Sequence, residues 1–128
     1  MERVLADTHA FVWWIEGREQ LSYQVREILE NPETTIYISA ASAWELAIKA
    51  RIGKFKSSAL ISGFSAELEK EGFLELPISI KHAVRAGMIK AAHKDPFDRM
   101  LAAQAQLEGL PILSNDKIFD KLSVRRIW

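Results

Sequence analysis

The chain alternates short apolar segments with segments of helical period, and this rhythm restricts its fold more than any other feature. Five segments rich in β-branched and apolar residues are predicted strands: 3–6, 34–39, 73–76, 111–113 and 124–127. The segments with helical patterning are 10–15, 23–30, 42–52, 58–70, 80–88 and 96–108. Strands that alternate with helices pair in parallel. We therefore expect an α/β fold, a three-layer α/β/α sandwich with a mostly parallel central sheet of about four to five strands.

The 128 residues contain no repeat, low-complexity segment or linker, so residues 1–128 are expected to form one domain. The expected buried face of the helix at 80–88 consists of Ile80, Ala83, Val84 and Met88, with Ser79 as the N-cap. The sequence has no charged and apolar leader and no apolar run of membrane-spanning length. A cytoplasmic protein without membrane contact is the resulting expectation.

Composition narrows the kinds of site that this chain can carry. Without cysteine, it has neither disulfides nor thiolate metal sites. Its three histidines, His9, His82 and His93, lack the spacing of zinc ligands, so a metal would be held by oxygen atoms, which favours magnesium or manganese. Seventeen basic and seventeen acidic residues give a net charge of zero, so nucleic acid would be contacted by a local basic patch.

Four carboxylates are predicted to meet at one edge of the sheet. Asp7 follows the first strand directly, and Asp116 comes shortly after the strand at 111–113. Glu45 lies one turn into the helix after the second strand, and Asp98 lies in the first turn of the helix at 96–108. In open parallel sheets, ligands bind beyond the carboxyl ends of the strands, where these four side chains are expected.

Each aspartate also has an ordinary structural explanation. Asp7 and Asp116 are suited to cap the helices that follow them. Asp98 resembles the acidic partner of a capping box whose cap is Asp95, with Pro96 at the first helical position. Asp95 is thus predicted to be a cap, while a supporting role near a ligand or a role as ligand stays open.

Glu45 has its own alternative, a surface ion pair with Lys49 four residues later. Its apolar neighbours, among them Trp44 and Leu46, argue against a broad solvent-facing surface. Carboxylates that crowd together near buried strand ends are costly unless a cation neutralises them. The four acids together therefore favour a shared metal site.

The segments around these acids resemble four acidic motifs of PIN-domain proteins, in particular those of VapC-type toxins from toxin–antitoxin pairs. The matching segments are LADTHAFVWW, SAASAWELAIK, HKDPFDRMLAAQA and PILSNDKIFD. They span the chain from Asp7 to Asp116, and their order and spacing are more specific than any one of them. His9 departs from the small or amide residue that relatives often carry there.

This resemblance implies a PIN-like fold and an endoribonuclease that uses Mg²⁺ or Mn²⁺. The family's catalytic and metal-binding acids fall on Asp7, Glu45, Asp98 and Asp116. Residues expected to support these ligands from the second layer are Thr8, Asp95, Ser114 and Asn115. The resemblance also implies an RNA substrate, a cognate antitoxin and a homodimer, and leaves open the RNA sequence and whether one or two ions bind.

Four basic residues near the motifs are predicted RNA contacts: Arg51, Lys54, Lys94 and Arg99. A solvated helix end is the alternative for this basic rim. The aromatic residues Phe11, Trp13 and Trp14 are expected in the core or in an interface rather than as a base-stacking platform.

Two other functions remain as alternatives. A PIN-like module that binds RNA or a partner without cleavage would not require four acids. A magnesium-binding receiver domain of signalling proteins would need adjacent acids after the first strand, where this chain has Asp7 followed by Thr8.

Overall fold

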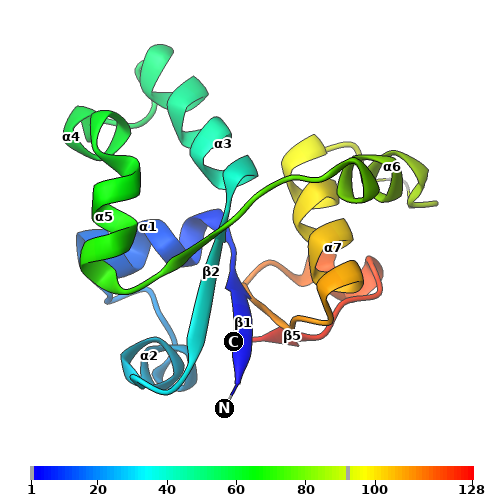
Figure 1. Ribbon diagram of the computed structural model, residues 1–128, viewed down its shortest axis with the longest axis horizontal. Helices are drawn as coiled ribbons and strands as arrows, with labels where there is room; N and C mark the ends of the chain where they lie inside the picture. Colours follow the sequence, from blue (N-terminus) through cyan, green and yellow to red (C-terminus); the bar gives the residue numbers. More distant parts are fainter. Residues whose placement is uncertain (1, 92) are drawn as a thin grey trace.

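A computed structural model describes residues 2–91 and 93–128, which form a parallel sheet with helices on both faces (Figure 1). The sheet has five strands in the order β3-β2-β1-β4-β5, and every neighbouring pair is parallel. The strands are β1 (Arg3–Ala6), β2 (Thr35–Ser39), β3 (Leu74–Leu76), β4 (Ile112–Leu113) and β5 (Arg126–Ile127). The helices are α1 (Thr8–Glu16), α2 (Tyr23–Glu30), α3 (Ala40–Arg51), α4 (Ser58–Ser62), α5 (Phe64–Glu71), α6 (Ile80–Met88), α7 (Pro96–Glu108) and the 3₁₀ helix η1 (Lys117–Lys121). The predicted α/β/α sandwich is confirmed.

The pleat of the sheet divides the core into two apolar layers. On β1, Val4 and Ala6 pack into the layer that includes α1, α2 and α5, whereas Leu5 packs into the layer that includes α7 and η1. Alternate residues of a strand point to opposite faces, so three consecutive apolar residues can all be buried. Figure 1 shows α1, α2 and α5 on one side of the strands and α6 and α7 on the other.

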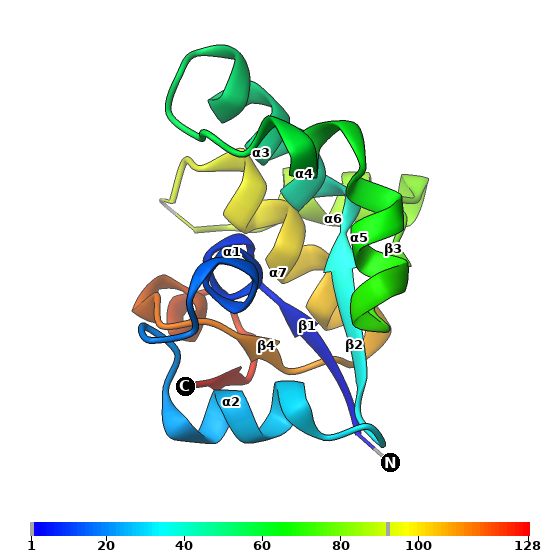
Figure 2. The same ribbon diagram turned by 90° about the vertical axis from the view of Figure 1, so that its left-hand side faces the viewer.

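Three helices differ from the prediction. The helix expected over 10–15 spans Thr8–Glu16, because Asp7 caps it. The helix expected to begin at Ser42 begins at Ala40, because the hydroxyl of Ser39 accepts a hydrogen bond from the backbone N–H of Ala41. The helix expected over 58–70 is two helices, α4 and α5, which are separated at Gly63. Figure 2 shows α3 and α4 beyond one end of β2, while α5 runs back along the strand.

The predicted buried face of α6 is wrong. Ile80, Val84 and Met88 are 84%, 60% and 69% exposed, and the side chains of α6 that are buried are His82 and Ala86. His82 accepts a hydrogen bond from the Ser79 N–H through Nδ1, and its Nε2 lies 2.9 Å from a carboxylate oxygen of Glu108 on α7. The helix is therefore docked through a polar residue and leaves its apolar face open. Among the described residues, no helix combines the length and apolar character needed to cross a membrane.

Helix α7 packs closely on the sheet because small residues cover its inner face. Ala102, Ala103 and Ala105 are buried, as is the side chain of Gln104. The Gln104 amide accepts a hydrogen bond from the Ser39 hydroxyl and donates one to the carbonyl of Pro77. These bonds join the C-terminal half of α7 to Ser39 at the end of β2 and to Pro77 directly after β3.

Candidate active site

The candidate site lies where the sheet order reverses, between β1 and β4. The chain passes from β1 outward to β2 and β3 and then returns to β4 on the other side of β1. The N–H of Asp7, directly after β1, donates to the carbonyl of Leu113 at the end of β4, with an N–O distance of 3.0 Å. Such switch points open a crevice beyond the carboxyl ends of the strands. Asp7 is thus held at the carboxyl ends of β1 and β4, at this switch point.

Asp7 is the most buried carboxylate of the site, with 4% of the residue exposed. It caps α1, and its Oδ1 accepts a hydrogen bond of 2.8 Å from the N–H of Ala10. Burial raises the pKa of Asp7 from 3.8 to about 6, although hydrogen bonds from Ser114 and Ala10 and the charge of His9 oppose the rise. The charge of Asp98 raises this pKa further. The cap alternative is therefore confirmed, yet the carboxylate also lies close to a second acid.

Asp98 is held by a histidine that precedes it in the chain. Oδ2 of Asp98 lies 2.8 Å from Nε2 of His93, from which the carboxylate accepts a hydrogen bond. The pKa of Asp98 is raised, mainly by burial, and the bond to His93 opposes this rise. The charges of Asp95 and Asp116 raise it as well. Asp98 thus lies within electrostatic reach of two other predicted acids, Asp7 and Asp116.

Asp95 combines a cap with a place beside the site. Its Oδ1 accepts hydrogen bonds from the N–H groups of Phe97 and Asp98, as predicted for the N-cap of α7. One potential ligand atom from each of Asp95, Asp98 and His93 lies within 4.8 Å of the other two. His93 is not predicted from the sequence, because His9, His82 and His93 lack the spacing of paired histidine ligands. Its signal was its position two residues before Asp95 in HKDPFD.

Ser114 links the two strands that carry the site. Its side chain is fully buried, its Oγ accepts a hydrogen bond of 3.0 Å from the Asp116 N–H, and its hydroxyl bonds to Asp7. Asp116 is exposed and caps η1 by accepting from the N–H of Ile118. Asn115, between them, is exposed. Ser114 therefore orients Asp7 and the backbone of Asp116 at the same time, which suits the supporting role predicted for it.

Glu45 and Thr8 make contacts away from this group. Oε2 of Glu45 lies 2.9 Å from Nζ of Lys49, which is the ion pair foreseen as its alternative. Glu45 is not among the groups that shift the pKa of Asp7 or of Asp98. The Thr8 hydroxyl is buried against the Ser42 hydroxyl at 2.8 Å and so joins α1 to α3.

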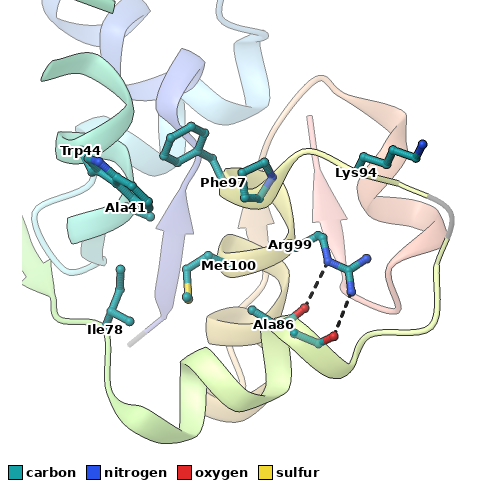
Figure 3. A pocket seen from close by; sticks show the side chains of 10 residues that line it. Ala41, Trp44, Ile78, Ala86, Lys94, Phe97, Arg99 and Met100 are labelled. Atoms are coloured by element: carbon teal, nitrogen blue, oxygen red, sulfur yellow. Dashed lines mark hydrogen bonds between the residues drawn. The ribbon is translucent and has the colours of Figure 1, made fainter. Parts of the chain in front are cut away.

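A mainly apolar groove of about 350 Å³ borders the first turn of α7 (Figure 3). Trp44 and Phe97 meet edge to face at its rim, with ring centroids 5.0 Å apart, and Ile78 and Met100 line it further in. Lys94 is exposed at one end. The groove can accept apolar side chains or the face of a base.

The remaining basic and aromatic predictions have separate outcomes. Arg51 and Lys54 are exposed at the end of α3, whereas the guanidinium of Arg99 is directed to backbone carbonyls. Phe11 and Trp14 are buried in the core, as expected. Trp13 is half-buried and stacks on His9.

The donor set fits a hard divalent cation. The carboxylates of Asp7 and Asp98 both have raised pKa values, which indicates that their negative charge is poorly compensated in the protein alone. A divalent ion is the usual means of stabilising carboxylates that lie close together near a buried strand end. The His93, Asp95 and Asp98 group supplies one nitrogen and two carboxylates that could hold such an ion.

Comparison with known proteins identifies similar chains. The profile of the PIN domain family matches residues 4–124. No curated protein matches the sequence significantly. In structure, the chain is similar to one in VapBC2 from Rickettsia felis bound to a DNA fragment from their promoter, with a TM-score of 0.70, 19% identity and coverage of 99% of this chain and 98% of that one. It is also similar to a chain of VapBC-1 from nontypeable Haemophilus influenzae (TM-score 0.69, 14% identity, coverage 99% and 97%) and of a toxin–antitoxin complex from Klebsiella pneumoniae (0.65, 17%, 98% and 96%).

Proposed function

Because the chain belongs to the PIN domain family, we propose that it is a metal-dependent endoribonuclease of the VapC type, the toxin of a toxin–antitoxin pair. The observation that carries this proposal is the buried carboxylate of Asp7 at the switch point, coupled in charge to Asp98. Two acids with raised pKa values at a strand end are costly to the fold, and such cost is typical of functional sites. A metal ion held by these two acids would activate water for attack on a phosphodiester, and this function would explain why the chain carries them.

In this proposal Asp7, Asp98 and Asp116 hold Mg²⁺ or Mn²⁺. The ion, when bound, lowers the pKa of a coordinated water and neutralises charge on the phosphate. Ser114 keeps the carboxylate of Asp7 in one orientation, and His93 does the same for Asp98. Glu45 is proposed as a further ligand on the strength of the sequence motif.

The proposed RNA contacts are the exposed residues Arg51, Lys54 and Lys94. With a net charge of zero, the protein would bind RNA through this local rim and through the metal ion rather than through its overall charge. Lys94 also lines the apolar groove, so an RNA strand that reaches the acids along this groove would pass Lys94.

We also propose an antitoxin partner and a homodimer. Support comes from the similar chains, which belong to VapBC assemblies and to a toxin–antitoxin complex. The open apolar face of α6, formed by Ile80, Val84 and Met88, supplies surface for such contacts. The test is to co-express the chain with any small reading frame that adjoins its gene and to ask whether the two products purify together and growth recovers.

The catalytic proposal is tested with purified protein and a mixed pool of RNAs. We expect cleavage with Mg²⁺ or Mn²⁺ and none with a chelator. Asp98→Asn is expected to reduce the rate by more than the roughly 10- to 100-fold typical of residues that only support a metal ligand. Glu45→Gln, tested beside it, shows whether the acid paired with Lys49 takes part.

Asp120→Asn is the matched control, because Asp120 pairs with Arg126 on the surface. It should cleave RNA at the normal rate. If Asp98→Asn keeps full activity, the assignment of the site is wrong. If the protein binds RNA and never cleaves it with either metal, a PIN-like binding module is the correct function.

A further inference from the structure

The guanidinium of Arg99 donates hydrogen bonds to backbone carbonyls at the end of α6 and in the connector between α6 and α7. The connector covers residues 89–95, of which the structure describes 89–91 and 93–95. Nε of Arg99 donates to the carbonyl of Ala86, one terminal nitrogen to those of Gly87 and Ile89, and the other to those of Ala91 and His93. The N–O distances run from 2.6 to 3.5 Å. Figure 3 shows the side chain turned toward the end of α6.

This arrangement uses properties that only arginine combines. The guanidinium is planar and always charged, and it carries five N–H donors in a fixed fork. The carbonyls of Ala86 and Gly87 lie in the last turn of α6, where carbonyls lack partners within the helix and a positive charge is favourable. One side chain therefore caps α6 and holds the connector that leaves it.

The connector ends at the site. His93, whose carbonyl accepts from Arg99, places its Nε2 2.8 Å from Oδ2 of Asp98, and Asp98 directly precedes Arg99 on α7. The geometry points to Arg99 as a positioning residue that fixes the connector, and through His93 the carboxylate of Asp98. Its N–H donors are used inside the protein, so a role in contacting RNA does not explain its geometry. The link to metal binding rests on the proposed function, whereas the ordering of the connector does not.

The first test measures the order of the connector by limited digestion with trypsin. Lys90 and Lys94 are exposed on it and provide the cleavage sites. Arg99→Lys keeps the charge and adds no new trypsin site, but an ammonium group cannot reach five carbonyls. We expect cleavage after Lys90 and Lys94 to accelerate about tenfold or more, as for the loss of charged hydrogen bonds. Arg85→Lys is the matched control, because the Arg85 guanidinium makes an exposed hydrogen bond to the Gln106 side chain and, among the described residues, donates to no carbonyl of the connector.

The second test measures Mn²⁺ affinity by electron paramagnetic resonance, without RNA. Arg99→Lys is expected to weaken Mn²⁺ binding roughly 10- to 100-fold, as does loss of other groups that orient a ligand. His93→Ala keeps the backbone carbonyl that Arg99 binds, so it should weaken Mn²⁺ binding while the connector stays resistant to trypsin. If Arg99→Lys does not fold, His93→Ala still tests the second half of the proposal, the link from the connector to Asp98.

Trypsin resistance of Arg99→Lys equal to that of the unchanged protein would overturn the proposal. Normal Mn²⁺ affinity in His93→Ala would equally remove the link from the connector to Asp98. If the unchanged protein binds no Mn²⁺, the metal site and the proposed function fail, while the trypsin result still decides whether Arg99 orders the connector.

Discussion

Replacing Asp7 with asparagine is expected to stabilise the metal-free protein at neutral pH. Asparagine has nearly the same shape and is an equally good helix cap, so the bond to the Ala10 N–H can be kept. The change removes a negative charge from a buried position beside Asp98. A residue proposed to hold the catalytic metal ion would then be one that weakens the fold.

The expected gain in the free energy of unfolding follows from the pKa of Asp7, which burial raises from 3.8 to about 6. The native protein thus holds this proton more tightly than the unfolded chain does, and the free energy of unfolding falls as the pH rises between these two values. At about 1.4 kcal/mol per pKa unit, the rise corresponds to about 3 kcal/mol of stability that is present at acid pH and lost above pH 6. Asp98, whose pKa is also raised, contributes with the same sign.

The assay is urea unfolding in chelator at several pH values, with Asp7→Asn compared with the unchanged protein. The difference in the free energy of unfolding should be close to zero near pH 4 and approach about 3 kcal/mol in favour of Asp7→Asn at pH 7.5. Saturating Mg²⁺ should reduce the difference by stabilising only the unchanged protein. A difference of zero at pH 7.5, or one that does not depend on pH, would refute the reasoning.

Two further predictions concern the surface. Lys54→Glu is expected to weaken RNA binding and to lower by about one the slope of log affinity against log salt concentration, which titrations at several salt concentrations would measure; an unchanged slope removes Lys54 from the contact. Val84→Asp changes a position of α6 that is 60% exposed, so the free energy of unfolding should change by less than about 0.5 kcal/mol. The same substitution should abolish self-association, which light scattering would measure. An unchanged molecular mass for Val84→Asp would show that this face of α6 is not where two copies meet.

The sequence was sufficient for features that depend on neighbouring residues. The cap at Asp95 with Pro96 behind it, and the cap at Ser79, are encoded within a few positions, and both are confirmed. The parallel sheet followed from the alternation of strands and helices. The proximity of Asp7 and Asp98, whose charges interact, also follows from the sequence, because both residues are predicted at the same end of a parallel sheet.

The predictions that failed concern features whose partners lie far away in the sequence or are backbone groups. The apolar period of α6 indicates a face that can be covered, but it does not say whether the chain itself covers it, and here His82 docks the helix instead. The partners of Arg99 are carbonyls, which every residue carries and which leave no trace in a sequence. Glu45 shows the reverse case, since a simple spacing rule found its contact with Lys49.

The pairing of β1 with β4 has a consequence for biosynthesis. Asp7 is made before its neighbours on β4 and Ser114, which follow it by more than one hundred residues. Such long-range pairing requires closure of a large loop and is slow compared with helix formation. A growing chain on the ribosome that has not yet extended past β4 cannot form the pairing of β1 with β4. The order of synthesis therefore keeps Asp7 from its partner Ser114 until β4 has been made.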